Sequence, residues 1–182
     1  MRKNSKYRIA TATCILILIS LTPYEIALVG FQINLAVIFL YLYSLGHIIL
    51  VKKKVGIHNL LCTYVLMLAY ASFLLFELYD PVWILFNRVW MIACVLGYLS
   101  VMLFSDKKDR ILFLIIAIIQ GEFLFAMIVK KIGFAYSVGT GQFLDTLSSA
   151  VLVLVIWSIC ESIIVSLDQY MNQHVRGKQK ST

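Results

Sequence analysis

The chain has few charged residues for its length. Of its 182 residues, 16 are Lys or Arg and 9 are Asp or Glu, so that 14% are charged, whereas 62% are hydrophobic. A soluble domain has on average about 25% charged and about 45–50% apolar residues. A water-soluble core cannot bury so large an excess of apolar surface, and we therefore expect a protein whose apolar surface is covered by lipid.

Several motifs that carry chemistry are also missing. The four cysteines, Cys14, Cys62, Cys94 and Cys160, form no C-x-x-C pair, and the three histidines form no H-x-x-x-H pattern. The sequence contains neither a G-x-x-x-x-G-K-[ST] loop nor a G-x-S-x-G nucleophile motif. We therefore expect no metal site, no cofactor, no catalytic residues and no enzymatic activity.

The basic residues lie in short clusters that separate the apolar runs and give a net charge of +7. This pattern is typical of loops that face an anionic membrane surface, and it indicates a lipid bilayer rather than nucleic acid as the partner. With the N-terminus inside, thirteen Lys and Arg residues fall in cytoplasmic segments, and only Lys130 and Lys131 fall on the opposite side. The bias predicts six spans with both termini in the cytoplasm.

Apolar runs of about 20 residues, the length that crosses a bilayer, predict where the spans lie. The third to sixth are expected at 60–79, 82–104, 111–129 and 145–167. The first two fall before Lys52, and two registers are open for them. The first helix ends near Leu21 and a long second helix begins at Pro23, or the first continues to about Val29 and the second begins near Asn34. Thr22-Pro23-Tyr24-Glu25 has the form of a helix start.

The predicted fold is therefore all-α, a polytopic integral membrane protein. A single domain over residues 1–167 forms a six-helix transmembrane bundle. Residues 168–182 are polar, and we expect them to form a disordered cytoplasmic tail.

Four ionisable side chains remain inside the predicted spans: Glu77, Arg88, Glu122 and Glu161. Such residues are costly in a bilayer and are candidate functional sites. Glu77 and Arg88 flank the turn at Asp80-Pro81, and they can pair across it with Asn87 beside them. Arg88 is then either an anion-binding group in an outward cavity or one half of a structural ion pair.

Gln120, Gly121 and Glu122 lie near the middle of the fifth predicted span. Residues two apart on a helix point about 200° from each other, so Gln120 and Glu122 cannot face the same neighbour. Either one faces lipid, or helices on two sides bury both, or the helix unwinds at Gly121. Glu122 is a ligand or proton carrier in one interpretation, and a partner of Arg88 or a hydrogen-bonded clasp in the other.

A polar stripe follows one face of the sixth span. Ser158, Glu161 and Ser162 lie at i, i+3 and i+4, and Trp157 borders them. We expect this stripe to face the bundle. Hydrogen bonds between helices are its structural interpretation.

Four short stretches resemble the YphA-like family of small bacterial membrane proteins. They are Tyr79-Asp80-Pro81-Val82-Trp83 with Asn87-Arg88, Gln120-Gly121-Glu122, Phe143-Leu144-Asp145, and Trp157. This resemblance covers most of the chain. It implies a multi-pass protein of the bacterial cell membrane, and it implies no reaction and no catalytic residues.

The expected function is that of a non-enzymatic accessory or interaction protein of the cell envelope, with another membrane protein as partner. The alternative is a small-molecule binding or transport subunit. In size and helix number the chain is similar to the substrate-binding subunits of energy-coupling-factor transporters, although their Ala-x-x-x-Ala pattern is imperfect here. That alternative requires a pocket that opens to the outside and admits water to Glu122. Its walls and rim would be Arg88, Asn87, Glu122, Glu77, Asp80 and Asp145.

Overall fold

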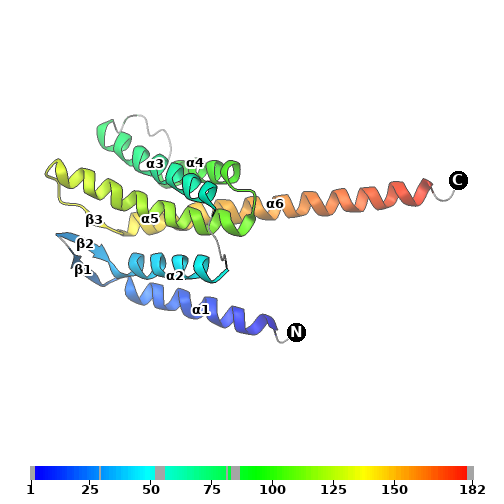
Figure 1. The fold of residues 1–182 in the computed structure, drawn as a ribbon, viewed down its shortest axis with the longest axis horizontal. Helices are drawn as coiled ribbons and strands as arrows, with labels where there is room; N and C mark the ends of the chain where they lie inside the picture. Colours follow the sequence, from blue (N-terminus) through cyan, green and yellow to red (C-terminus); the bar gives the residue numbers. More distant parts are fainter. Residues whose placement is uncertain (1–2, 29, 52–55, 81, 83–86, 180–182) are drawn as a thin grey trace.

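The fold is mostly helical. The computed structural model describes residues 3–28, 30–51, 56–80, 82 and 87–179. The helices in these residues are α1 (Lys3–Leu21), α2 (Leu35–Val51), α3 (Ile57–Tyr79), α4 (Arg88–Leu103), α5 (Lys107–Lys131) and α6 (Gly141–Gln179). Consecutive helices run in opposite directions, so that both ends of the chain lie at the same end of the molecule (Figure 1).

Three of the helices are long and apolar enough to cross a membrane: Ile57–Tyr79, Asp109–Lys131 and Gly141–Gln169. The other apolar helices are shorter and cover Ala12–Leu21, Leu35–Leu50 and Arg88–Leu103. The central part of each predicted span is thus helical in the residues that the structure describes, and three of these helices have the length of a full span.

A small sheet departs from the all-α prediction. β1 (Glu25–Leu28) and β2 (Phe31–Asn34) form an antiparallel hairpin, and β3 (Ser137–Val138) pairs with β2 in parallel. Gly30 in the hairpin turn has a φ of +77°, which glycine adopts without steric cost. The sheet lies at the end of the molecule opposite the two termini, where it connects α1, α2, α5 and α6 (Figure 1).

Each of the two registers predicted for the first two helices is correct for one helix end and wrong for the other. α1 ends at Leu21 as in the first, whereas α2 begins at Leu35, close to the start in the second. The predicted helix start at 22–25 is wrong because Glu25 begins a strand that pairs with β2. Asn34 caps α2 instead: its Oδ1 accepts from the amide of Ala36 at 2.9 Å, and its Nδ2 donates to the Thr22 carbonyl at 2.7 Å.

The later helices also differ from the prediction at their ends. α4 begins at Arg88 rather than Val82, because Asn87 Oδ1 accepts from the Val89 amide at 3.0 Å and caps the helix there. Residues 83–86 of that predicted span lie outside the described residues. α6 continues to Gln179, so the predicted disordered tail is helical as far as the structure describes it. Residues 168–179 contain no proline to interrupt a helix.

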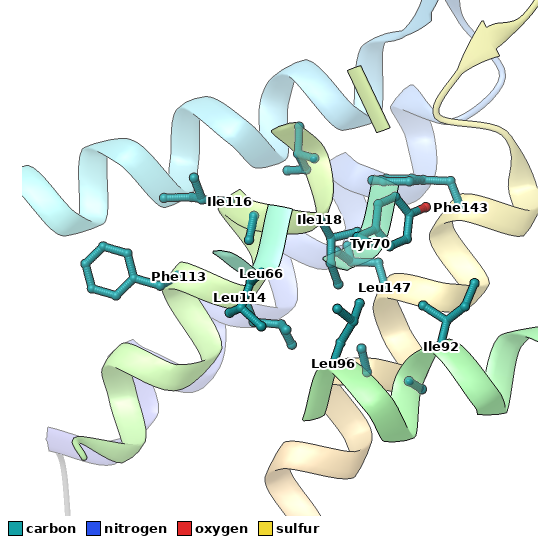
Figure 2. Close-up of a cluster of buried hydrophobic side chains, with 14 of the residues drawn as sticks. Leu66, Tyr70, Ile92, Leu96, Phe113, Leu114, Ile116, Ile118, Phe143 and Leu147 are labelled. Atoms are coloured by element: carbon teal, nitrogen blue, oxygen red, sulfur yellow. The ribbon is translucent and has the colours of Figure 1, made fainter. Parts of the chain in front are cut away.

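The apolar core lies where α3, α4, α5 and α6 meet (Figure 2). α3 packs mainly against α5, and α4 packs mainly against α6. The central side chains are Leu66 and Tyr70 from α3, Ile92 and Leu96 from α4, Leu114 and Ile118 from α5, and Phe143 and Leu147 from α6. Tyr70 brings a hydroxyl into this core, and a buried hydroxyl needs a hydrogen-bond partner.

Candidate functional site

The partner of the Tyr70 hydroxyl is Glu122, which is 1% exposed. Glu122 Oε2 accepts from the Tyr70 hydroxyl at 2.7 Å, and its Oε1 accepts from the Tyr136 hydroxyl at 2.6 Å. We call Glu122, Tyr70 and Tyr136 the Glu122 cluster. The two tyrosine hydroxyls bond to both oxygens of Glu122, and a carboxylate can only accept hydrogen bonds. The cluster therefore joins α3, α5 and the segment before α6.

Two glycines allow the backbone to approach this cluster. A Cβ on Gly121 would lie 2.7 Å from Tyr70 Cδ1 and 2.9 Å from the Met67 carbonyl oxygen, so α3 and α5 meet here without an intervening side chain. Gly139 has a φ of +86°, and a Cβ there would overlap the Val37 side chain. The close packing requires glycine at both positions.

α5 is continuous through Gly121, so the unwinding interpretation is wrong. Of the three arrangements considered, the structure has the one in which neighbours on two sides cover both polar residues. Glu122 faces the interior, and Gln120 is half-buried toward α2, where its Nε2 donates to the Tyr41 hydroxyl at 3.3 Å.

Tyr136 lies between α5 and α6, outside the long apolar stretches. Burial raises the pKa of its phenol well above its usual range, and the nearby Glu122 carboxylate raises that pKa further. The hydroxyl therefore keeps its proton at ordinary pH and remains a donor to Glu122.

Glu77 and Arg88 form the ion pair that the sequence suggests. Arg88 Nε lies 2.9 Å from Glu77 Oε2, and Arg88 Nη1 donates to Gln142 Oε1 at 3.0 Å. The two side chains are 21% and 29% exposed, respectively. Arg88 therefore connects α3, α4 and α6 beside the Glu122 cluster.

The other residues predicted near this end have local roles in the structure. Asn87 is exposed and caps α4. Asp80 is exposed, and its Oδ1 accepts from the Val82 amide at 3.1 Å. Asp145 is exposed on the first turns of α6. With Glu122 buried, the described residues do not form the water-filled opening to Glu122 that the pocket interpretation expects.

Glu161 lies at the opposite end of the bundle, near the start of α5. Its Oε1 accepts from Arg110 Nη1 and from Trp157 Nε1, both at 2.7 Å, and its Oε2 lies 3.6 Å from Lys107 Nζ. Lys107 also donates to Ser162 Oγ at 2.8 Å. The polar stripe of α6 thus faces α5, and its contacts are the hydrogen bonds between helices that the structural interpretation expects.

Sequence reasoning missed most of these partners. Tyr70, Tyr136, Gln142 and Tyr41 were not singled out, and the two tyrosines of the Glu122 cluster lie 52 and 14 residues from Glu122 in the chain. A tyrosine inside an apolar helix is a weak signal in itself, since its hydroxyl must find a partner. No feature of the sequence says which partner that is.

The described residues contain no group of three or more His, Cys, Asp or Glu side chains placed to hold a metal ion. The polar side chains instead bond to one another between apolar helices.

Apolar helices long enough to cross a membrane, with polar side chains bonded to one another between them, are typical of a helical integral membrane protein. The chain belongs to the family of YphA-like integral membrane proteins, whose model matches residues 1–180. The resemblance of the four short stretches is thereby confirmed. A relative named "Uncharacterized protein YphA", from Bacillus subtilis (strain 168), is 25% identical over 181 residues, which are 98% of this chain and 88% of the relative. No solved structure matches the chain.

Proposed function

We propose that the protein crosses the bacterial plasma membrane six times, with both termini in the cytoplasm. The distribution of Lys and Arg supports this orientation, because the positively charged side of a membrane protein faces the cytoplasm. The alternating direction of the six apolar helices is consistent with it. In this orientation Lys107, Arg110 and Glu161 mark the cytoplasmic boundary, and the sheet with Lys130 and Lys131 faces outward.

Within this frame we propose a non-enzymatic interaction protein that binds a membrane-associated protein through α6. The observation that carries the proposal is the length of α6. Its 39 residues extend roughly 58 Å at 1.5 Å per residue, whereas the hydrocarbon core of a bilayer is about 30 Å thick. About half of the helix therefore extends past the bundle, as Figure 1 shows.

The first part of this extension is apolar. Ile163, Ile164, Val165 and Leu167 are each between 54% and 59% exposed, and they follow Glu161 along the helix. Lys107 and Arg110 bond to α6 at this level, so these four side chains lie at the cytoplasmic end of the apolar stretch Gly141–Gln169, next to the charged boundary. Lipid covers apolar side chains only within the hydrocarbon region, and a partner protein would cover them outside it.

The pocket alternative has less support. Each group that would form its wall is already engaged: Arg88 with Glu77 and Gln142, Asn87 with the α4 amide, and Glu122 with two tyrosines. A ligand in that place would have to displace these bonds.

Site-specific photo-crosslinking in cells tests the interaction proposal. A photoreactive residue at Ile164 or Leu167 is expected to give a protein adduct of defined mass, and Ile163→Glu is expected to reduce its yield. The same photoreactive residue at Leu152, which is exposed on the bundle part of α6, is the matched control and should not give that adduct. Adducts with lipid alone at Ile164 and Leu167 would refute the proposal.

A further inference from the structure

A groove lies between α2 and α5, apart from both the Glu122 cluster and the extension of α6. It has a volume of about 380 Å³, and its walls are mainly apolar side chains such as Val37, Ile38, Ile119 and Phe123. Among the residues that the structure describes, no Lys, Arg, Asp or Glu lines it. The volume is near the lower end of the range for small-molecule sites, about 300–1,000 Å³.

The groove carries two polar groups on its wall. Gln120 and Tyr41 both line it, and the Gln120 amide forms a single long hydrogen bond of 3.3 Å with the Tyr41 hydroxyl. An amide and a phenol together offer several donors and acceptors, whichever way the amide is turned. Among the residues that the structure describes, the remaining donors and acceptors of these two side chains have no partner.

These polar groups lie where water and lipid headgroups do not reach. Gln120 is the central residue of the apolar stretch Asp109–Lys131, so in a spanning helix it lies near the middle of the bilayer. Headgroups are about 15 Å away from that level, half the thickness of the hydrocarbon core. Acyl chains offer no hydrogen bond, and an unmade hydrogen bond in an apolar medium is costly.

We propose that this groove binds a neutral, mainly apolar small molecule that dissolves in the bilayer and carries one hydroxyl or carbonyl group. The apolar walls would hold the body of the molecule. Gln120 and Tyr41 would form hydrogen bonds with its polar group, which explains why both side chains lie at this depth. The described residues of the wall include no charged side chain, so an ionic ligand group would have no counter-charge there. This proposal is independent of the α6 interaction surface.

The test uses the full-length protein in phospholipid vesicles and two photoreactive probes, decanol and decane that each carry a diazirine on the chain. Decanol is expected to label peptides of α2 and α5 about tenfold more than decane does. Unlabelled decanol should compete, and unlabelled decane should not. The double variant Tyr41→Phe and Gln120→Leu keeps the apolar shape and should remove the preference for decanol.

The matched control is Tyr98→Phe, which removes a hydroxyl from an exposed tyrosine on α4, and this variant should retain the preference. Ile38→Trp, which puts a larger side chain into the groove from a half-buried position, should abolish labelling by both probes at α2 and α5. Equal labelling by decanol and decane, unchanged in the double variant, would overturn the proposal. Crosslinks between two copies of the chain that the double variant abolishes would overturn it as well, because another copy would then occupy the groove.

Discussion

At the scale of single residues, the polar groups of the bundle are arranged in pairs and small clusters. Glu122 accepts hydrogen bonds from two tyrosines, and Arg88 forms an ion pair with Glu77 and donates a hydrogen bond to Gln142. A buried polar group contributes little when it is paired and costs much when its partner is lost. The Glu122 cluster is therefore best tested by changing the acceptor and the donors separately.

Replacing Glu122 by Leu leaves the hydroxyls of the buried Tyr70 and the half-buried Tyr136 without an acceptor. Glu122→Leu should lower the free energy of unfolding by about 2–4 kcal/mol, since an unpaired buried hydroxyl costs about 1–3 kcal/mol and the half-buried hydroxyl of Tyr136 costs about 1 kcal/mol. Glu122→Gln should cost less, because its amide still offers an acceptor and a donor to the tyrosines. Denaturation by SDS in mixed micelles measures both values. Adding Tyr70→Phe and Tyr136→Phe to Glu122→Leu should restore part of the lost free energy of unfolding. If none is restored, the two hydroxyls do not depend on Glu122 as their acceptor.

The ion pair between Glu77 and Arg88 makes a similar prediction. Arg88→Ala should lower the thermal unfolding midpoint in detergent, with a cost of about 1–3 kcal/mol, because Glu77 and Gln142 lose their partner in a half-buried place. The double variant Glu77→Gln and Arg88→Gln should lose less free energy of unfolding than the sum of the losses in the single variants Glu77→Gln and Arg88→Gln. Additive losses would show that the two side chains do not interact.

At the scale of elements, the contact between α3 and α5 depends on Gly121. Gly121→Ala places a methyl group within 3 Å of the Tyr70 ring and of the Met67 carbonyl. Such overpacking typically costs about 1–3 kcal/mol, so the variant should unfold at a lower temperature.

Gly46→Ala is the matched control, because a Cβ at Gly46 of α2 meets nothing within 4 Å. Alanine is favoured over glycine inside a helix by about 1 kcal/mol, and the control should be neutral or slightly stabilised. Equal effects at the two positions would mean that helix propensity, not packing, governs Gly121.

The helices could be predicted from the sequence, and their connections could not. Apolar runs identify all six helices because a bilayer imposes both length and hydrophobicity. The hairpin 25–34 was mistaken for a helix start, since Thr22-Pro23-Tyr24-Glu25 satisfies the local rules for one. Its strand β2 pairs with β3, more than a hundred residues away in the chain. The tyrosine partners of Glu122 were missed for the same reason, because tertiary contacts decide them.

At the scale of the whole molecule, the two ends of the bundle are different. One end carries the bonds of Lys107 and Arg110 with Glu161, both chain termini and the extension of α6. The other carries the sheet, the Glu77–Arg88 pair, and Lys130, whose Nζ donates to the Gly30 carbonyl at 3.1 Å. The α6 proposal depends on this polarity, because it decides which surfaces face the cytoplasm, whereas Gln120 lies at the centre of the apolar stretch Asp109–Lys131 in either orientation.

Cysteine labelling in intact cells measures this polarity most directly. In a variant without the four native cysteines, a cysteine at Phe134, 61% exposed in the connection before β3, should react with a membrane-impermeant maleimide added outside. A cysteine at the exposed Ser105 before α5 should react only after the membrane is permeabilised. Labelling of Ser105→Cys from outside, with Phe134→Cys protected until permeabilisation, would contradict the account.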